Sequence, residues 1–184
     1  MKKASDVNER DEARNLSNQG AACLRLFEEL VSECLRRLQA ADRLDTGAVG
    51  RFTFSLPPQA VELLQRARDH YLAALRLMPK EEAGNLAVLH HQLGGIYKHL
   101  DEAERAEHHL GEAIRLHAAV GDGFRCGQSH HDLAETLVHR GRRYAQALTH
   151  ARAALELFQQ AGSGAAREAH RTAGLVAELE SYLS

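Results

Sequence analysis

The chain has 184 residues, a formal net charge of −2 and a pI near 6.6, with 26% charged and 44% hydrophobic residues. Basic and acidic residues are interleaved, which argues against nucleic-acid binding, because such proteins usually carry a basic excess or stripe. No apolar run approaches the ~20 residues of a membrane span, and the polar start has no secretory core. We therefore expect a cytoplasmic protein with no membrane partner, whose three unpaired cysteines are free thiols.

The N-terminal third of the chain predicts a polar tail, a helix and a loop. Residues 1–11 are polar and are expected to be disordered. Residues 12–44 carry an apolar stripe that includes Leu24, Phe27 and Val31 at three- and four-residue steps, which predicts a helix. The stretch 45–58, DTGAVGRFTFSLPP, ends it. A connection of this length is unusual inside a compact domain, so we expect it to be functional or mobile.

Prolines and glycines divide the rest of the chain into six further helices. Pro79 ends the first of these, because proline lacks the N–H and clashes with the preceding turn. The glycine-rich pieces 121–123 and 162–164 end two others. The expected helices are 59–78, 82–100, 101–120, 124–140, 144–161 and 165–183. With the helix at 12–44 this predicts an all-α protein of about seven helices.

A pattern of small and bulky residues recurs after forty positions. The first copy reads His90-x2-Leu93-Gly94-x2-Tyr97, then Ala106-x3-Leu110-x2-Ala113, and the second reads His130-x2-Leu133-Ala134-x2-Leu137, then Ala147-x3-Ala151-x2-Ala154. These residue types and spacings resemble the tetratricopeptide repeat, in a variant of about 40 residues. We expect a single domain at 12–184 with these parts: a divergent first unit 12–79 with the inserted loop 45–58, repeats 84–121 and 124–162, and a capping helix 164–184.

The resemblance implies a helix-hairpin solenoid whose first helices line a concave groove. It also implies a protein–protein interaction scaffold or adaptor that holds a peptide or helix of a partner in this groove. The residues expected to face the groove are Val88, His91, Gly95, Lys98, His99, Gln128, His131, Glu135, His139, Arg171 and Glu178.

Most of the 12 histidines follow the same forty-residue grid, which repetition of a structural unit explains. His90 and His130 take the place of the family's usual aromatic residue, and we expect them to pack between helices. An alternative remains open for the groove histidines, which would converge from two neighbouring helices and give metal- or pH-dependent binding. That alternative rests on His91, His99, His131 and His139, with Glu135 as a further ligand.

No residue pattern points to catalysis, so we expect neither an enzyme nor a cofactor or bound metal. Ser129, His130, His131 and Asp132 include the residue types of a catalytic triad, but consecutive helical residues point around the axis. The glycine-rich pieces do not follow strands and are not phosphate loops.

Two further possibilities concern partners. In the first, the chain is a regulatory or sensor domain acting in cis on a larger effector, with the N-terminal helix or the 45–58 loop filling the groove. In the second, apolar residues of the last helix either cap the array or pair with another copy in a homo-oligomer. The residues concerned are Leu175, Val176, Leu179 and Leu183.

Overall fold

A computed structural model describes the backbone of residues 2–42, 56–141 and 143–184, and the side chains of 7–37, 56–139 and 143–184. Within these residues the fold is all-α, with seven α-helices, one 3-10 turn and no strand. The elements are α1 (Lys2–Asp42), α2 (Pro58–Leu77), α3 (Ala83–His99), α4 (Ala103–Ala119), α5 (Gly123–Gly141), α6 (Tyr144–Gln160), η1 (Gly162–Ala165) and α7 (Ala166–Leu183).

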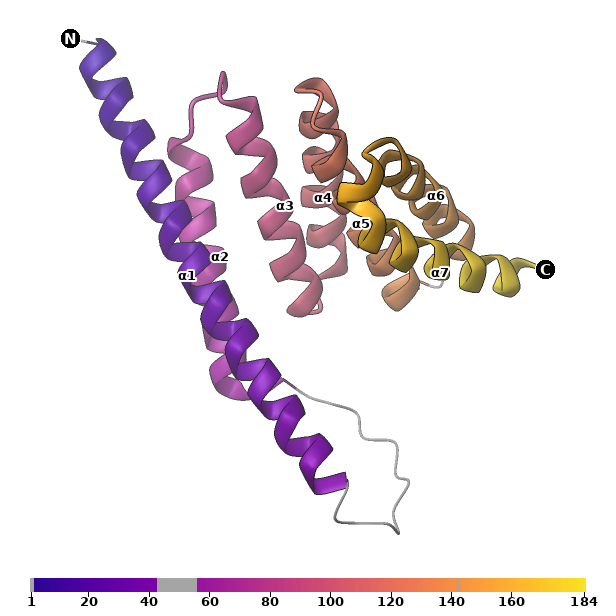
Figure 1. Ribbon diagram of the computed structural model, residues 1–184. Coiled ribbons are helices and arrows are strands. Elements are labelled where there is room, and N and C mark those ends of the chain that lie inside the picture. Colours follow the sequence, from indigo (N-terminus) through magenta and orange to yellow (C-terminus); the bar gives the residue numbers. More distant parts are fainter. Residues whose placement is uncertain (1, 43–55, 142) are drawn as a thin grey trace.

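Consecutive helices form hairpins that stack side by side into a helix-hairpin solenoid (Figure 1). The hairpins are α1–α2, α3–α4 and α5–α6, and α7 lies against the last of them (Figure 1). Short turns of three residues, such as 100–102, force neighbouring helices to run antiparallel. In this described part of the chain, none of the helices has the length and apolar character needed to cross a bilayer.

The helices from 58 onward begin and end within two residues of the predicted positions. At the N-terminus the structure differs from the prediction. Residues 2–11 were expected to be disordered, but α1 is already helical at Lys2. The polar composition of this segment does not reveal that other helices lie beside α1. In the structure Ala13 is fully buried, and Arg10 forms an ion pair with Glu82 next to α3. Most of the expected loop 45–58 lies outside the described residues, and Pro58 is the first residue of α2.

Within each of the first two hairpins, a bulky side chain of the second helix lies against a glycine of the first. A Cβ atom on Gly94 would lie 2.5 Å from Cγ of Leu110, and one on Gly20 would lie 2.8 Å from Cε2 of Tyr71. Gly20 is therefore the counterpart of Gly94 in the first hairpin. The sequence comparison missed it because Gln19 and Cys23 replace the flanking leucine and tyrosine.

The apolar core is divided into two main clusters along the array. The first joins α1, α2 and α3 through side chains such as Phe27, Leu64 and Leu93. The second joins α5, α6 and α7 and begins at Leu110 of α4. Leu179 is fully buried in the second cluster, while Leu175 and Val176 pack against it. The last helix thus covers the end of the array, although Leu183 remains 49% exposed.

The neighbouring glycines of α3 offer a test of the close contact between helices. We expect Gly94→Ala to lower the free energy of unfolding by about 1–3 kcal/mol, because the new methyl group overlaps Leu110. Gly95→Ala meets no atom within 4 Å and should raise the free energy of unfolding by up to about 1 kcal/mol through helix propensity. Urea unfolding followed by circular dichroism measures both, and equal stability of the two variants would contradict this packing.

Candidate functional site

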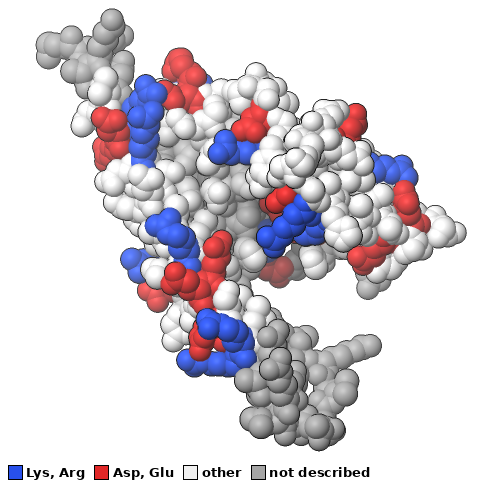
Figure 2. Space-filling model, in the orientation of Figure 1, with Lys and Arg blue, Asp and Glu red and all other residues white. Residues whose placement is uncertain are grey.

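The first helices of the hairpins and α7 form a row, which we call the first-helix face. The rings of Phe27 on α1 and His99 on α3 lie 5.2 Å apart. Lys98 on α3 contacts Asp132 on α5 at 2.8 Å, and His131 on α5 contacts Thr172 on α7 at 2.9 Å. Side-chain contacts therefore connect α1, α3, α5 and α7 in sequence. Acidic and basic side chains are interleaved over the visible surface of the molecule and are not gathered by sign (Figure 2).

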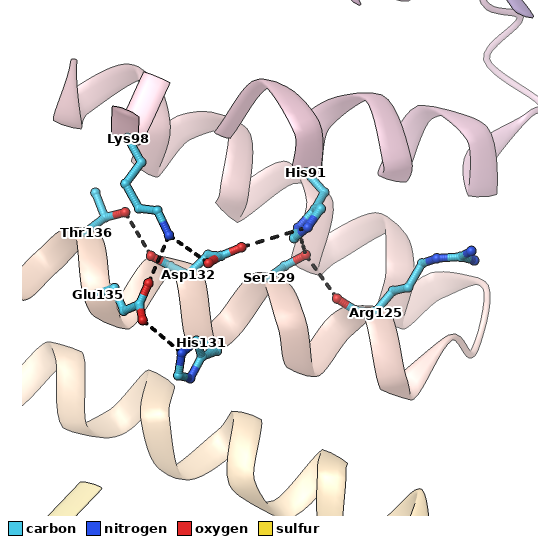
Figure 3. Close-up of polar contacts among 8 residues, drawn as sticks. All are labelled: His91, Lys98, Arg125, Ser129, His131, Asp132, Glu135 and Thr136. Carbon is cyan, nitrogen blue, oxygen red and sulfur yellow. Dashed lines mark hydrogen bonds and ion pairs between the residues drawn. The ribbon is translucent and has the colours of Figure 1, made fainter. Parts of the chain in front are cut away.

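Lys98 is the centre of the polar contacts between α3 and α5 (Figure 3). Its Nζ donates to Oδ1 of Asp132 at 2.8 Å and to Oε2 of Glu135 at 2.9 Å. Burial alone would lower the pKa of Lys98, but the two carboxylates outweigh burial and raise it. Burial would raise the pKa of Glu135, but hydrogen bonds from His131 and Lys98 hold it well below its usual range. The ammonium group is thus already neutralised within the chain.

The hydrogen bonds of His91 identify its tautomer. Oγ of Ser129 donates to the carbonyl oxygen of Arg125 at 3.1 Å, so this hydroxyl proton is already in use. The Nδ1 atom of His91, 3.0 Å from the same Oγ, must therefore be the donor in their contact. Burial lowers the pKa of His91 although Asp132 opposes the effect, which favours the neutral ring. His91 therefore connects α3 to α5 as an uncharged hydrogen-bond donor.

His131 does not line a groove, which corrects the sequence prediction. It is only 1% exposed, because α7 covers it. Its Nε2 lies 3.0 Å from Oε1 of Glu135, a carboxylate that can only accept, and Nδ1 lies 2.9 Å from Oγ1 of Thr172. His131 therefore connects α5 to α7. The sequence pattern placed it on the correct side of α5 but could not show that α7 would cover that position.

Two hollows open on the first-helix face, one on each side of the Lys98–Asp132 ion pair. The first has a volume of about 620 Å³, and the predicted groove residues lining it are Lys98, His99, Glu135 and His139. The second has a volume of about 570 Å³ between α3, α5 and α7, and includes the predicted residues His91, Gln128 and Arg171. Seven of the eleven predicted residues therefore line one hollow or the other.

The remaining predicted residues lie elsewhere, and the second hollow has lining residues that the sequence reasoning missed. Val88 and Gly95 are half-buried, and exposed Glu178 accepts a hydrogen bond from the Tyr182 hydroxyl at 3.0 Å. The missed lining residues are Asp132, Phe158, Arg167, Glu168 and His170. Asp132 carried a usable signal, since it stands three residues before Glu135 on the same helical face.

The four groove histidines do not meet at one point. His91 contacts Ser129, and His131 is held by Glu135 and Thr172. His99 and His139 line the first hollow, where His99 also lies against Phe27. Over the described part of the chain, no group of three or more His, Cys, Asp or Glu residues is placed to hold a metal ion.

No family model and no curated protein matches this chain. Among solved structures, it is similar to the crystal structure of BtubC (BKLC) from P. vanneervenii, with a TM-score of 0.55 and 18% sequence identity. The match covers 96% of this chain and 80% of that chain. At this identity the similarity concerns the fold alone, and it extends over nearly the whole stack of helices described above.

The role of Lys98 can be measured by removing its charge. We expect Lys98→Met to lower the free energy of unfolding by about 1–3 kcal/mol, because Asp132 and Glu135 would lose a shared, half-buried charged donor. Arg115→Met is the control, since it removes an exposed i,i+3 ion pair with Glu112 and should change stability little. Chemical unfolding at pH 7 compares the two, and a similar small loss in both would contradict a structural role for Lys98.

His117 is a buried titratable group at the end of α4. This ring is 1% exposed, and neither nitrogen has a hydrogen-bond partner among the described residues. Burial lowers the pKa of His117; Asp122 opposes this effect, while His91 and Arg125 reinforce it. As the pH falls, the unfolded chain therefore binds a proton at this ring near pH 6.5, whereas the folded chain binds it only at a lower pH. Its contribution to stability is complete above about pH 6.5 and is lost as the pH falls toward the lowered value.

We accordingly expect the free energy of unfolding of His117→Leu to fall less than that of the wild type between pH 7.5 and 5.5. Urea midpoints measured across this range give the comparison. His170→Leu, at an exposed position of α7, should keep the wild-type pH dependence. An unchanged slope in His117→Leu would show that this ring does not limit stability in acid.

Proposed function

We propose that the chain is a tetratricopeptide-like array that acts as a protein–protein interaction scaffold, binding a peptide or helix of a partner on the first-helix face. The observation that carries this proposal is the pair of hollows, about 620 and 570 Å³, separated by the Lys98–Asp132 ion pair. Two neighbouring first helices, α3 and α5, and α7 contribute to their walls, so a ligand lying across both would contact several helices at once. Extended binding surfaces of this kind are typical of stacked helical repeats.

The chemistry of the second hollow supports a peptide ligand. Exposed Arg171 and Arg167 offer guanidinium donors and Gln128 offers an amide, while Phe158 at the same hollow is only 2% exposed. Such donors suit the carbonyl oxygens and carboxylates of a peptide. Lys98 contributes less to binding, because its charge is satisfied by Asp132 and Glu135.

The environment of Ser129, the serine next to His130, also fits a binding role. Ser129 is fully buried and its hydroxyl donates to a backbone carbonyl, so its oxygen is neither accessible nor activated. This arrangement supports the proposal of a scaffold without catalytic activity.

The test compares two double variants with matched chemistry. Gln128→Ala/Arg171→Glu alters the second hollow, whereas Gln65→Ala/Arg66→Glu makes the same changes at exposed positions of α2. Each chain, after its helical circular dichroism is verified, serves as bait for capture from lysate, and the affinity of every retained protein is then measured. We expect a partner whose affinity falls about tenfold or more in the first variant, about 1.4 kcal/mol, and is unchanged in the second.

Loss of the partner in the α2 variant alone would contradict the proposal and place binding on the outer helices. Equal retention by both variants would exclude the second hollow. A chain that captures nothing would favour the other candidate, a domain that regulates a larger effector in cis.

A further inference from the structure

Two of the hairpins enclose the same pair of imidazoles. Nδ1 of His90 on α3 lies 3.1 Å from Nδ1 of His109 on α4. Nδ1 of His130 on α5 lies 2.9 Å from Nδ1 of His150 on α6. All four rings are half-buried between the two helices of their hairpin, away from the residues that line the two hollows.

The rings of each pair face one another nearly head-on. Their centroids are 5.1 Å apart in both pairs, slightly less than the distance between the nitrogens plus the radii of the two rings. Each Nδ1 therefore points at the other, and two neutral rings in this position share one proton in an N–H···N hydrogen bond. Lone pairs directed along one line also suit an ion with two ligands on opposite sides. They do not suit an ion that needs a bent N–metal–N angle.

The rings are in the state that binds metals. Burial lowers the pKa of His109 and of His130 to about 4, with the partner histidine adding to the effect, and burial also lowers the pKa of His90 and His150. All four imidazoles are thus neutral at pH 7, and neutral imidazole is the form that ligates metal ions.

We propose that each histidine pair is a two-coordinate site for a monovalent d10 cation, specifically Cu⁺, bound between the two Nδ1 atoms. The ion takes the place of the shared proton, which moves to Nε2 of the same ring through solvent, so no net proton is released. With metal–nitrogen bonds of about 2 Å, the nitrogens must separate by about 1 Å, which rotation of half-buried side chains can supply. Imidazole is an accepted ligand for copper.

The surroundings favour a monovalent ion over a divalent one. Over the described residues, no third His, Cys, Asp or Glu completes a metal cluster, so the tetrahedral shell that zinc prefers is missing. A divalent ion held by only two neutral ligands at a half-buried site would lose more hydration energy than a monovalent ion. An entry path is present at the second pair, where His150 lines an open hollow of about 360 Å³ together with Leu133, Gln146 and Thr149.

The experiment is an anaerobic titration of the full chain with Cu⁺ in competition with a chromophoric chelator. The wild type should bind two histidine-dependent equivalents, His90→Gln one, and His90→Gln/His130→Gln none. Glutamine keeps a side chain that can hydrogen-bond to the remaining histidine, and circular dichroism checks that the hairpins stay folded. His109→Gln/His150→Gln removes the opposite member of each pair and should give the same loss.

The controls separate these sites from other ligands. His108→Gln changes an exposed ring beside His109 and should leave both equivalents in place. The three cysteines are present in every variant, so thiol binding cancels in the comparison. X-ray absorption of the histidine-dependent equivalents should show two nitrogen ligands. A sulfur shell, or the same number of equivalents in wild type and both double variants, would overturn the proposal.

Discussion

The architecture depends on how closely the two helices of a hairpin approach each other. Where Gly20 faces Tyr71 and Gly94 faces Leu110, a large side chain lies directly on the backbone of the opposite helix. This contact sets the separation of the helices and leaves one hairpin too thin to bury its apolar surface alone. Stacking of hairpins supplies the missing cover, and it places the first helices side by side.

The first-helix face is built across the division between the two apolar clusters. Phe27, Leu64 and Leu93 belong to the first cluster, while Leu133 and Leu179 belong to the second. Between them, α3 and α5 are joined by the ion pairs of Lys98 and the hydrogen bond of His91. Polar residues that resemble free ligands in the sequence therefore hold the second and third hairpins together, with one hollow on each side of them.

Much of the fold could be predicted because helix periodicity and turn residues are local signals. Pro79 and the glycine-rich turns gave the helix ends to within two residues from α2 onward. The errors arose where a distant element decides the outcome. Residues 2–11 are helical, although their own composition does not reveal the helices that lie beside α1. Gly20 lacks the leucine and tyrosine that flank Gly94, so the sequence pattern did not identify it.

The candidate site shows the same limit. Helical spacing identified the side of α3 and α5 on which His91, Lys98 and Glu135 lie, but not which positions remain accessible. His131 is covered because Thr172 of α7 reaches it, a contact over 41 positions in the chain. The pairing of His90 with His109 was equally hidden, since the sequence aligned each histidine with its repeat copy and not with its neighbour across the hairpin.

The junction between the second and third hairpins has a consequence for how the array comes apart. On the first-helix face it is made by the ion pairs of Lys98 and the hydrogen bond of His91, whereas on the other side Leu110 and Ile114 of α4 share the second apolar cluster with α5. Cooling weakens apolar contacts, while salt acts on charges and screens half-buried pairs less than exposed ones. Cooling therefore acts on the α4–α5 side of this junction and salt on its first-helix side, so the two conditions loosen the array in different places.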